Sequence, residues 1–458
     1  MSALRAPQLP EETIRARART GPEAAFPVVE GYGLTLFGAP GRAAPPLESA
    51  ASDWSGGSAA AEAFDPLDAA RIVPPVFVPR RLERLIDLGR EPLYSDVELG
   101  SRLGGFASAL PLFVCAFGST QVAAGGGLGT AVSTQAGRLG IPMVIGENIV
   151  PMHGYGRAGE DPAKGLLGRI RAYADAAPDG LGGVVVQQST EDADAEVWNL
   201  VYSDPSATEL LESGRLAFEL KVGQGAKPGL GGMTLLSRTA ASSVADHYAL
   251  DEAFGPESDL VLRSSSPGTF TEEILRQQVH LMRNNYPRAR TWVKLHPGRD
   301  VHRAAEIAWS AGADAVTVDG AEGGTGWAPS VFLGEVGLPL AECLRRLRRA
   351  ERDAGGEPGA GDGGGPPEAR SLLVSGRIWE GGRALKCLAL GAAAAGLGRA
   401  ALLAVDEDPR DGLIRLVRCL EFELRLLISA LGKYRVADLG VEDVWFPSAA
   451  MRGREGQG

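Results

Sequence analysis

A lysine in the segment TWVKLHPG is the first residue whose position suggests chemistry. Lys294 lies between Val293 and Leu295 in a short β-rich run. Because side chains alternate along a strand, Lys294 faces away from both neighbours, and in a barrel it points into the interior. An ammonium group there is costly unless an anion lies beside it. The lysine therefore predicts either an anionic ligand or a structural Lys–Glu pair. His296 follows as a candidate acid or base, although a loop histidine is more often a structural hydrogen-bonding group.

Glycine-rich loops accompany the last three predicted strands. AEGGTG (321–326) follows the run 315–320, RIWEGG (377–382) follows 371–376, and GLGRA (396–400) precedes the last run. Backbone N–H groups bind phosphate closely only where no Cβ intervenes, which favours glycine. A single loop of this kind could be an ordinary turn, but three in succession predict a phosphate-bearing cofactor or substrate. Together with Lys294 they favour a flavin, since an ammonium would stabilise negative charge at N1 and C2=O of the reduced ring.

A third cluster is ELKVGQGAKPGLGG (219–232). Lys221 ends a predicted strand, and Gln224 and Lys227 lie in the glycine-rich loop after it. Two lysines and an amide at a strand end suit an anionic substrate or the flavin edge. The alternative is a solvated basic loop.

The elements that would position these residues alternate between strand and helix. Helical stretches such as 271–287 and 301–313 carry apolar residues at helical spacing, and nearly continuous apolar runs lie between the helices. This pattern predicts a parallel sheet covered on both faces, and we favour a (β/α)8 TIM barrel. An open doubly wound sheet remains an alternative, although no GxGxxG follows the first strand. We treat 259–264 as an element outside the barrel, because nine runs are predicted. They are 111–117, 141–146, 182–188, 217–223, 259–264, 291–295, 315–320, 371–376 and 400–405.

Composition excludes several classes of protein. The 458 residues carry a net charge of −11, which argues against a nucleic-acid surface. The four cysteines are far apart, so we expect no disulfide and no metal site, and a cytoplasmic location. Apolar stretches fall short of about 20 residues, so no membrane span is expected. Three arginines near the start (Arg15, Arg17 and Arg19) predict an exposed charged helix, with a targeting helix as the alternative.

The predicted organisation has three parts. Residues 1–90 form a partly flexible N-terminal extension rich in Ala, Gly, Pro and Ser. Residues 91–445 form the barrel, with a disordered insertion near 354–369, where AGGEPGAGDGGGPPEA cannot bury enough apolar area to fold. Residues 446–458 form a flexible tail.

Several motifs together resemble the FMN-binding synthase domain of glutamate synthase. QGAKPGLGG (224–232) is similar to the family's QGAKPGEGG, and DGAEGGTGWAP (319–329) to its SGHDGGTGASP. The resemblance also includes VKL (293–295) and the GRIWEGGRAL and LGAAAAGLGRAAL pair, and it covers roughly residues 92–440. It implies an FMN-binding (β/α)8 barrel in which Lys294 faces the flavin. The glycine loops would hold the phosphate through Gly323, Gly324, Thr325, Ser375, Gly376, Gly398 and Arg399. Other strand-end residues predicted to contact the cofactor are Cys115, Ala116, Gln187, Lys221, Asp319 and Arg377.

Departures from the family are equally informative. The cysteine-rich 3Fe–4S segment after the last strand is replaced by a stretch with Cys419 alone, and SPPPHHD is replaced by RSSSPGTF (263–270). Neither an N-terminal nucleophilic cysteine nor an amidotransferase domain is recognised. Leu230 stands in place of the family's acid. We therefore expect a flavoenzyme without an iron–sulfur relay.

The leading functional hypothesis is an FMN-dependent oxidoreductase that passes hydride between flavin N5 and a small amino, imino or hydroxy acid. Lys221, Gln224, Lys227 and Asp161 are the predicted substrate-binding residues. Lys294, Lys227, His296 and Glu160 are the catalytic candidates, and we expect Asp319 to face the substrate while Glu322 braces its loop. The alternatives are a redox-neutral FMN-dependent isomerase or lyase on the same barrel, and a non-catalytic flavin-binding subunit of a larger complex. The possible assemblies are a complex with a partner subunit and a homo-oligomer.

Overall fold

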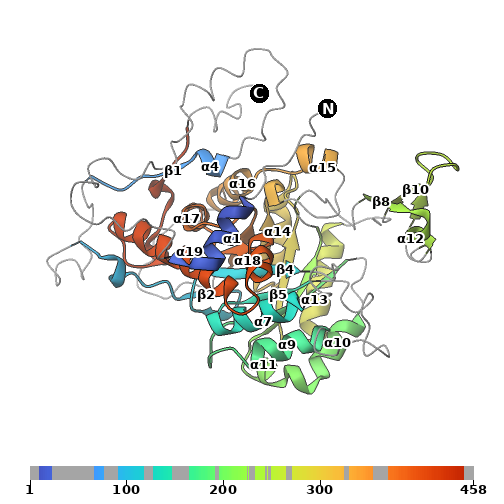
Figure 1. Ribbon diagram of the computed structural model, residues 1–458, viewed down its shortest axis with the longest axis horizontal. Coiled ribbons are helices and arrows are strands. Elements are labelled where there is room, and N and C mark those ends of the chain that lie inside the picture. The colour runs from blue at the N-terminus through green and yellow to red at the C-terminus, as the bar shows by residue number, and fades with distance from the viewer. Residues whose placement is uncertain are drawn as a thin grey trace, which may run out of the picture.

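Eight parallel strands close into a barrel in the computed structural model (Figure 1). The structure describes residues 10–22, 66–76, 91–117, 127–146, 165–190, 195–223, 225, 233–242, 245, 249–264, 271–323, 330–353 and 370–447. The strands follow one another around the barrel in chain order, and the last pairs with the first. The predicted TIM barrel is confirmed. Its strands are β4 (Leu112–Phe117), β5 (Met143–Ile145), β6 (Val184–Ser189), β7 (Leu216–Lys221), β11 (Arg290–Leu295), β12 (Ala315–Asp319), β13 (Ser371–Ser375) and β14 (Ala394–Leu397).

Helices cover the outside of the barrel because the strands are apolar on both faces. All six residues of β6 are buried, for example, so this strand needs a helix on one side and the barrel interior on the other. Most of these helices bury an apolar stripe, and two of them also bury a charged residue, Arg169 and Arg383. The covering helices are α7 (Leu128–Leu139), α9 (Leu166–Ala174), α10 (Ala195–Ser203), α11 (Thr208–Glu212), α13 (Glu272–Asn285), α14 (Val301–Ser310), α15 (Ser330–Glu335), α16 (Leu340–Asp353), α17 (Gly381–Ala389), α18 (Arg399–Glu407) and α19 (Gly412–Ala430).

A short hairpin closes the N-terminal end of the barrel. It consists of β2 (Ser101–Leu103) and β3 (Phe106–Ser108). The Phe106 ring lies 5.4 Å from that of Trp292, whose Nε1 donates a 3.0 Å hydrogen bond to the Gly104 carbonyl oxygen. The barrel interior at this end is therefore filled by large apolar side chains, which leaves the other end for a site.

The last strand corrects the prediction for residues 400–405. That run is helical, within α18, and the eighth strand is Ala394–Leu397. Alanine and leucine have the strongest helix propensities, and their apolar character alone does not distinguish a buried helix from a strand. Gly398 and Arg399 consequently follow the last strand rather than precede it. This places them at the same end of the barrel as the other glycine loops.

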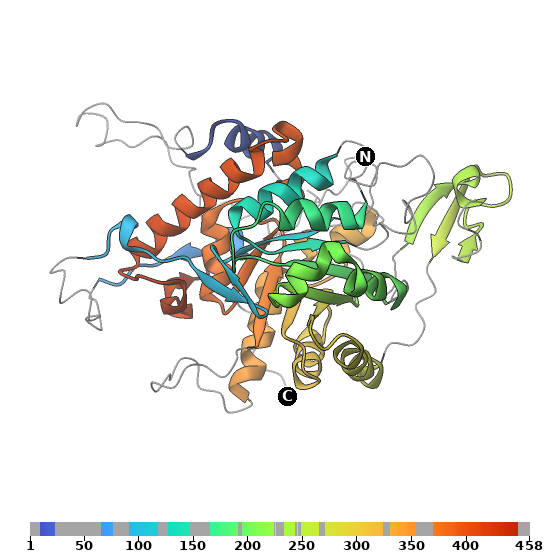
Figure 2. The ribbon, with the colours of Figure 1, turned by 90° about the horizontal axis from the view of Figure 1, so that it is seen from below.

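A small antiparallel unit separates β7 from α13. Strands β8 (Met233–Ser237), β10 (Leu260–Ser264) and β9 (Ala249–Asp251) pair in that order, beside α12 (Arg238–Ser242). Both views show this unit standing away from the barrel (Figures 1 and 2). The prediction that 259–264 lies outside the barrel is confirmed.

N-terminal segments lie against the late part of the chain. Helix α1 (Glu11–Thr20) contacts α18 and α19, and it buries Ile14 and Ala18 (Figure 2). The short helix α4 (Pro66–Ala69) lies beside α16 and α17, and β1 (Arg71–Ile72) pairs with β15 (Val444–Trp445). The helix predicted from the early arginines is present, but it packs against α18 and α19 and is not wholly exposed as predicted. In the part of the chain that the structure describes, no helix combines the length and apolar character needed to cross a membrane. The predicted insertion at 354–369 and the tail from 448 onward lie outside the described residues.

Candidate active site

Lys294 lies inside the barrel near its C-terminal mouth. The side chain is buried, and its Nζ lies 3.2 Å from an oxygen of Asp319 on the neighbouring strand β12. Ser375 on β13 donates a hydrogen bond to the other Asp319 oxygen. Three adjacent strands thus each contribute one polar side chain at the level where the strands end. The Asp319 carboxylate balances the charge of the Lys294 ammonium. The structural ion pair that was one of the two predictions is thus present, with an aspartate in place of the glutamate.

A second polar group lies in the interior beside this pair. Glu219 on β7 accepts hydrogen bonds from Gln187 Nε2 and, at 2.9 Å, from Thr317 Oγ1. Among the described residues, the Gln187 Oε1 atom is buried and has no hydrogen-bond partner. An orphan acceptor at such a site is ready for a ligand N–H, because a buried unsatisfied polar atom costs free energy.

Burial and charge act in opposite directions on the ionisable groups of this interior. Burial raises the pKa of Glu219, and Lys294 only partly offsets that increase. Burial lowers the pKa of Lys294, but the nearby carboxylates, chiefly Asp319, outweigh it, so the net pKa lies above the usual value. Burial also raises the pKa of the Cys115 thiol to about 12. Lys294 is therefore a fixed cation at neutral pH, and Cys115 is a neutral thiol.

Glycines of the late loops leave room for a ligand. Gly376 follows β13 with φ +142°, a conformation that favours glycine, and a Cβ on it would lie 3.4 Å from the Gly320 nitrogen. A Cβ on Gly323 would lie 3.5 Å from the Gly376 Cα, so the β12 and β13 loops touch. Gly398 caps α18 without a side-chain hydrogen bond, and a Cβ there would meet no described atom within 4 Å. The N-terminus of α18 thus offers backbone donors and a partial positive charge, the chemistry that binds phosphate.

Buried ion pairs tie these loops to other segments. The Glu322 carboxylate accepts the Leu340 N–H at 3.0 and 3.1 Å, and it lies 2.8 Å from Arg383 Nη2. Arg383 Nη1 also contacts Asp68 at 3.0 Å, and Asp68 in turn lies 2.6 Å from Arg377 Nη1. Glu322 points away from the barrel interior and braces its loop, as expected, whereas Asp319 points toward Lys294.

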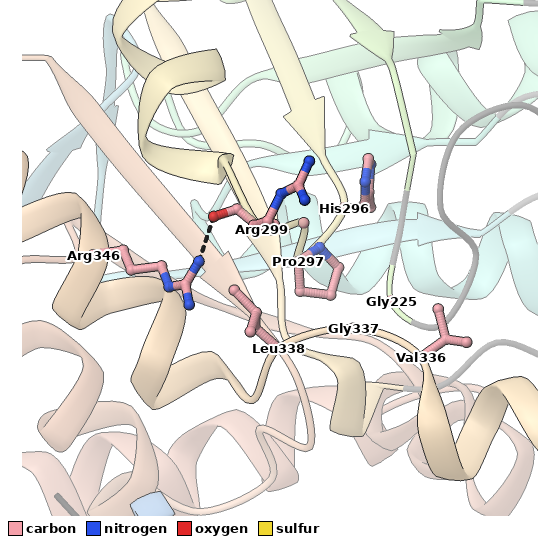
Figure 3. A pocket seen from close by; sticks show the side chains of 9 residues that line it. Gly225, His296, Pro297, Arg299, Val336, Gly337, Leu338 and Arg346 are labelled. Atoms are coloured by element: carbon pink, nitrogen blue, oxygen red, sulfur yellow. Dashed lines mark hydrogen bonds between the residues drawn. The ribbon is translucent and has the colours of Figure 1, made fainter. Parts of the chain in front are cut away.

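A depression of about 370 Å³ lies beside the loop that follows β11. Figure 3 shows His296 at one side of it, on the loop after β11, with Arg299 and Arg346 nearby. Burial lowers the pKa of His296, partly offset by Asp300, so its imidazole is neutral at pH 7. Its Nδ1 is buried and has no partner among the described residues. Gly225, Val336, Gly337 and Leu338 complete the mostly apolar walls.

The described residues among those predicted all lie at strand ends or in the loops that follow. Six predicted residues (Glu160, Asp161, Gln224, Lys227, Gly324 and Thr325) lie outside the described part of the chain. Sequence reasoning missed Glu219, Thr317, Arg383 and Asp68. Alternation in AFELK places Glu219 on the same side of its strand as Lys221, and this signal could have identified it. No comparable signal pointed to Asp68, since its partners are about 310 residues away in sequence.

The residues present fit an FMN group. The α18 N-terminus and Gly376 suit a phosphate, and the lysine cation with the orphan Gln187 acceptor suits the pyrimidine edge of a flavin. Across the described residues, no group of three or more His, Cys, Asp or Glu side chains could hold a metal ion. Cys115, Cys343, Cys387 and Cys419 are buried free thiols.

Comparison with known proteins matches a region of the chain that contains five of the eight barrel strands. Residues 207–407 match the family described as the conserved region in glutamate synthase. This part of the chain is similar to the conserved region of glutamate synthase. This region begins just before β7 and ends with α18, so it includes Lys294, Asp319 and all three glycine loops.

Relatives of this region are larger proteins. The archaeal-type glutamate synthase [NADPH] of Dehalococcoides mccartyi is 32% identical over 198 residues, which are 43% of this chain and 36% of that protein. The glutamate synthase large subunit-like protein of Rhizobium meliloti is 34% identical over 194 residues, covering 42% of this chain and 40% of that protein. The match therefore spans less than half the length of either relative.

Solved structures with the same fold extend the comparison beyond that region. The flavin-binding domain of baker's yeast flavocytochrome b2 aligns with 86% of this chain and 79% of that chain, at a TM-score of 0.52 and 16% identity. A soluble mutant of (S)-mandelate dehydrogenase from Pseudomonas putida aligns with 96% of this chain and 99% of that chain, at a TM-score of 0.51 and 16% identity. At these identities the likeness establishes the barrel fold.

Proposed function

We propose that this chain binds FMN at the C-terminal mouth of its barrel and is an oxidoreductase for a small anionic amino, imino or hydroxy acid. The observation that carries the proposal is the buried Lys294–Asp319 pair, which lies beside the glycine loops within the glutamate synthase region. The names of the glutamate synthase relatives and of the flavin-binding structural neighbour support the cofactor and the reaction class. Iron–sulfur ligands are not part of the proposal.

The chain's own groups divide the work of binding. Backbone donors at Gly376 and at the N-terminus of α18 would hold the phosphate. Lys294 would place a permanent positive charge beside the pyrimidine edge, and Gln187 Oε1 would accept a ring N–H. When bound, FMN would supply hydride acceptance and donation.

Substrate would occupy the depression beside His296. Arg299 and Arg346 line it, with Arg346 also paired with Glu342 at 2.7 Å; their positive charge would favour a carboxylate, while the apolar walls would limit the size of the substrate. A neutral His296 can accept a proton at Nδ1, where no described residue competes for the lone pair. Lys221 ends the neighbouring strand β7 and remains the second candidate for the substrate carboxylate.

The test is flavin binding by the purified protein and by Lys294→Met. The wild-type protein should show flavin absorption as purified or after FMN is added. This absorption should bleach when an amino or hydroxy acid is added anaerobically. Removing the cation should slow flavin reduction by roughly 100-fold or more, a typical effect of deleting one charge-stabilising group. Lys433→Met is the matched control, because Lys433 is also ion-paired but contacts Asp443 and Glu442 instead of the barrel interior. A wild-type protein that binds no FMN, or a K294M protein that reduces flavin at the control's rate, contradicts the proposal.

A further inference from the structure

We infer that Arg383 is a positioning residue that holds the β12 and β13 glycine loops in one arrangement, and that Asp68 of the N-terminal segment fixes Arg383. The inference rests on the proposed function, because these loops form the proposed phosphate site. Arg383 lies within the GRIWEGGRAL segment but was not among the predicted site residues, Asp68 lies outside the motifs, and neither is assigned to touch the cofactor. Their contribution would be to the shape of the site.

Arg383 joins three segments that are distant in sequence. Its Nη2 lies 2.8 Å from Glu322 in the β12 loop, and its Nε donates a 2.9 Å hydrogen bond to the Gly376 carbonyl in the β13 loop. Its Nη1 lies 3.0 Å from Asp68 in α4. The Arg383 side chain is 1% exposed, and its contacts with Glu322 and the Gly376 carbonyl are made away from solvent screening, whereas the Asp68 side chain is 44% exposed. The planar guanidinium can direct donors to three places at once, which an ammonium on a flexible stem cannot do in the same geometry.

The loops that Arg383 joins are in close contact. Gly320 donates to the Ser375 carbonyl at 2.8 Å, and the Gly323 and Gly376 backbones touch through faces that lack a Cβ. Glu322 is held from the other side by the Leu340 N–H. A change in the distance between Glu322 and Gly376 would therefore move the backbone that is proposed to cradle the phosphate.

Asp68 also restrains the residue after Gly376. Arg377 is the described non-glycine residue with positive φ, at +55°, and this conformation is costly for a side-chain-bearing residue. Its Nη1 lies 2.6 Å from Asp68, so the ion pair holds the strained residue in place. Lys386 Nζ donates to the Leu67 carbonyl at 2.7 Å, which fixes the short helix that carries Asp68. Two arginines and two carboxylates thus form a cluster without net charge behind the loops. They are Arg377, Arg383, Asp68 and Glu322.

The first test compares FMN with riboflavin, which lacks the phosphate, in Arg383→Lys. This substitution preserves the charge and removes the three-way geometry. We expect FMN to bind about tenfold more weakly, which corresponds to about 1.4 kcal/mol, while riboflavin affinity stays unchanged. Arg370→Lys is the matched control, since Arg370 makes a two-pronged pair with the exposed Glu306 just before β13. Equal losses for both flavins, or no loss of FMN affinity, would overturn the assignment.

The second test needs no cofactor. Asp68→Asn in the ligand-free protein should increase amide hydrogen exchange in residues 319–323 and 375–377, because the fixing carboxylate is lost. The Asp406→Asn control removes a comparable carboxylate that pairs with Arg15 at the far end of α18, and it should leave both loops unchanged. Unchanged exchange in D68N contradicts the inference even if FMN binds. Absence of FMN binding by the wild type would instead reject the proposed function, while the exchange result still decides whether the clamp exists.

Discussion

At the scale of single residues, the described part of the barrel interior around Lys294 holds more acidic than basic side chains. Glu219 and Asp319 lie near one cation, Lys294, which is already paired with Asp319. Burial is the main reason that the pKa of Glu219 is raised, because it disfavours the charged carboxylate. The orphan Gln187 Oε1 lies on the amide that already contacts Glu219. A neutral donor at position 219 could satisfy this acceptor if the amide turns, because the two ends of an amide are nearly equal in shape.

Glu219→Gln should therefore stabilise the protein in a pH-dependent way. In the wild type the folded pKa lies above the unfolded pKa, so the unfolded state ionises first and stability falls as pH rises through that window. The glutamine variant does not ionise, and its N–H can donate to Gln187 Oε1. Its melting temperature should exceed that of the wild type at pH 7 to 8. Below about pH 4, near the unfolded pKa, the advantage should shrink.

Thermal melts across this pH range measure the effect, with Glu335→Gln on an exposed helix position as control. A constant difference between E219Q and wild type at every pH would show that ionisation of Glu219 does not control stability. Lower stability of E219Q at pH 8 would contradict the orientation of the hydrogen bonds as well.

At the scale of elements, period-two alternation and apolar runs were sufficient to predict seven of the eight barrel strands. The prediction of the eighth strand failed because AAGL at 394–397 is short and has small side chains. The alanine- and leucine-rich run after it is equally apolar, but it forms a helix. The lysine position was predictable from alternation alone. The Arg383 and Asp68 contacts were not, because they depend on how α4 lies against α17, and no local pattern encodes that packing.

The hairpin that closes the barrel gives a prediction at this scale. Gly104 has φ +54°, and a Cβ on it would lie 2.5 Å from the Trp292 ring. Gly104→Ala should therefore destabilise the fold by about 2 to 4 kcal/mol, which combines overpacking with the left-handed backbone. Gly100→Ala is the matched control in the same segment, because a Cβ there meets nothing within 4 Å and its backbone has no positive φ.

Denaturant unfolding measures the two alanine variants. G104A should lower the midpoint substantially while G100A stays near wild type. Equal midpoints would mean that the hairpin is not packed against Trp292. Because the hairpin lies at the end of the barrel opposite the site, G104A protein that folds should keep its flavin affinity.

At the scale of the whole molecule, the barrel and the small antiparallel unit have separate cores. Val261 and Ala241 are buried within the unit, and neither belongs to the main hydrophobic core of the barrel. The opposite face of its sheet exposes Leu235 and Leu260. The N-terminal segments differ, since α1 contributes Ile14 and Ala18 to the main core. The barrel with α1 is thus expected to unfold as one unit, and the antiparallel unit independently of it.

Val261→Asp tests this division of the molecule. A buried carboxylate in so small a core should unfold the antiparallel unit, because taking a charge out of water costs more than the small core contributes. Hydrogen exchange should then become fast in 233–242 and 249–264, while the calorimetric transition of the barrel stays in place. Val316→Asp, a matched substitution at a fully buried position of β12, should instead abolish the barrel transition. If V261D lowered the barrel transition as V316D does, the unit would belong to the barrel's cooperative core, and the separation seen in Figure 2 would have no thermodynamic counterpart.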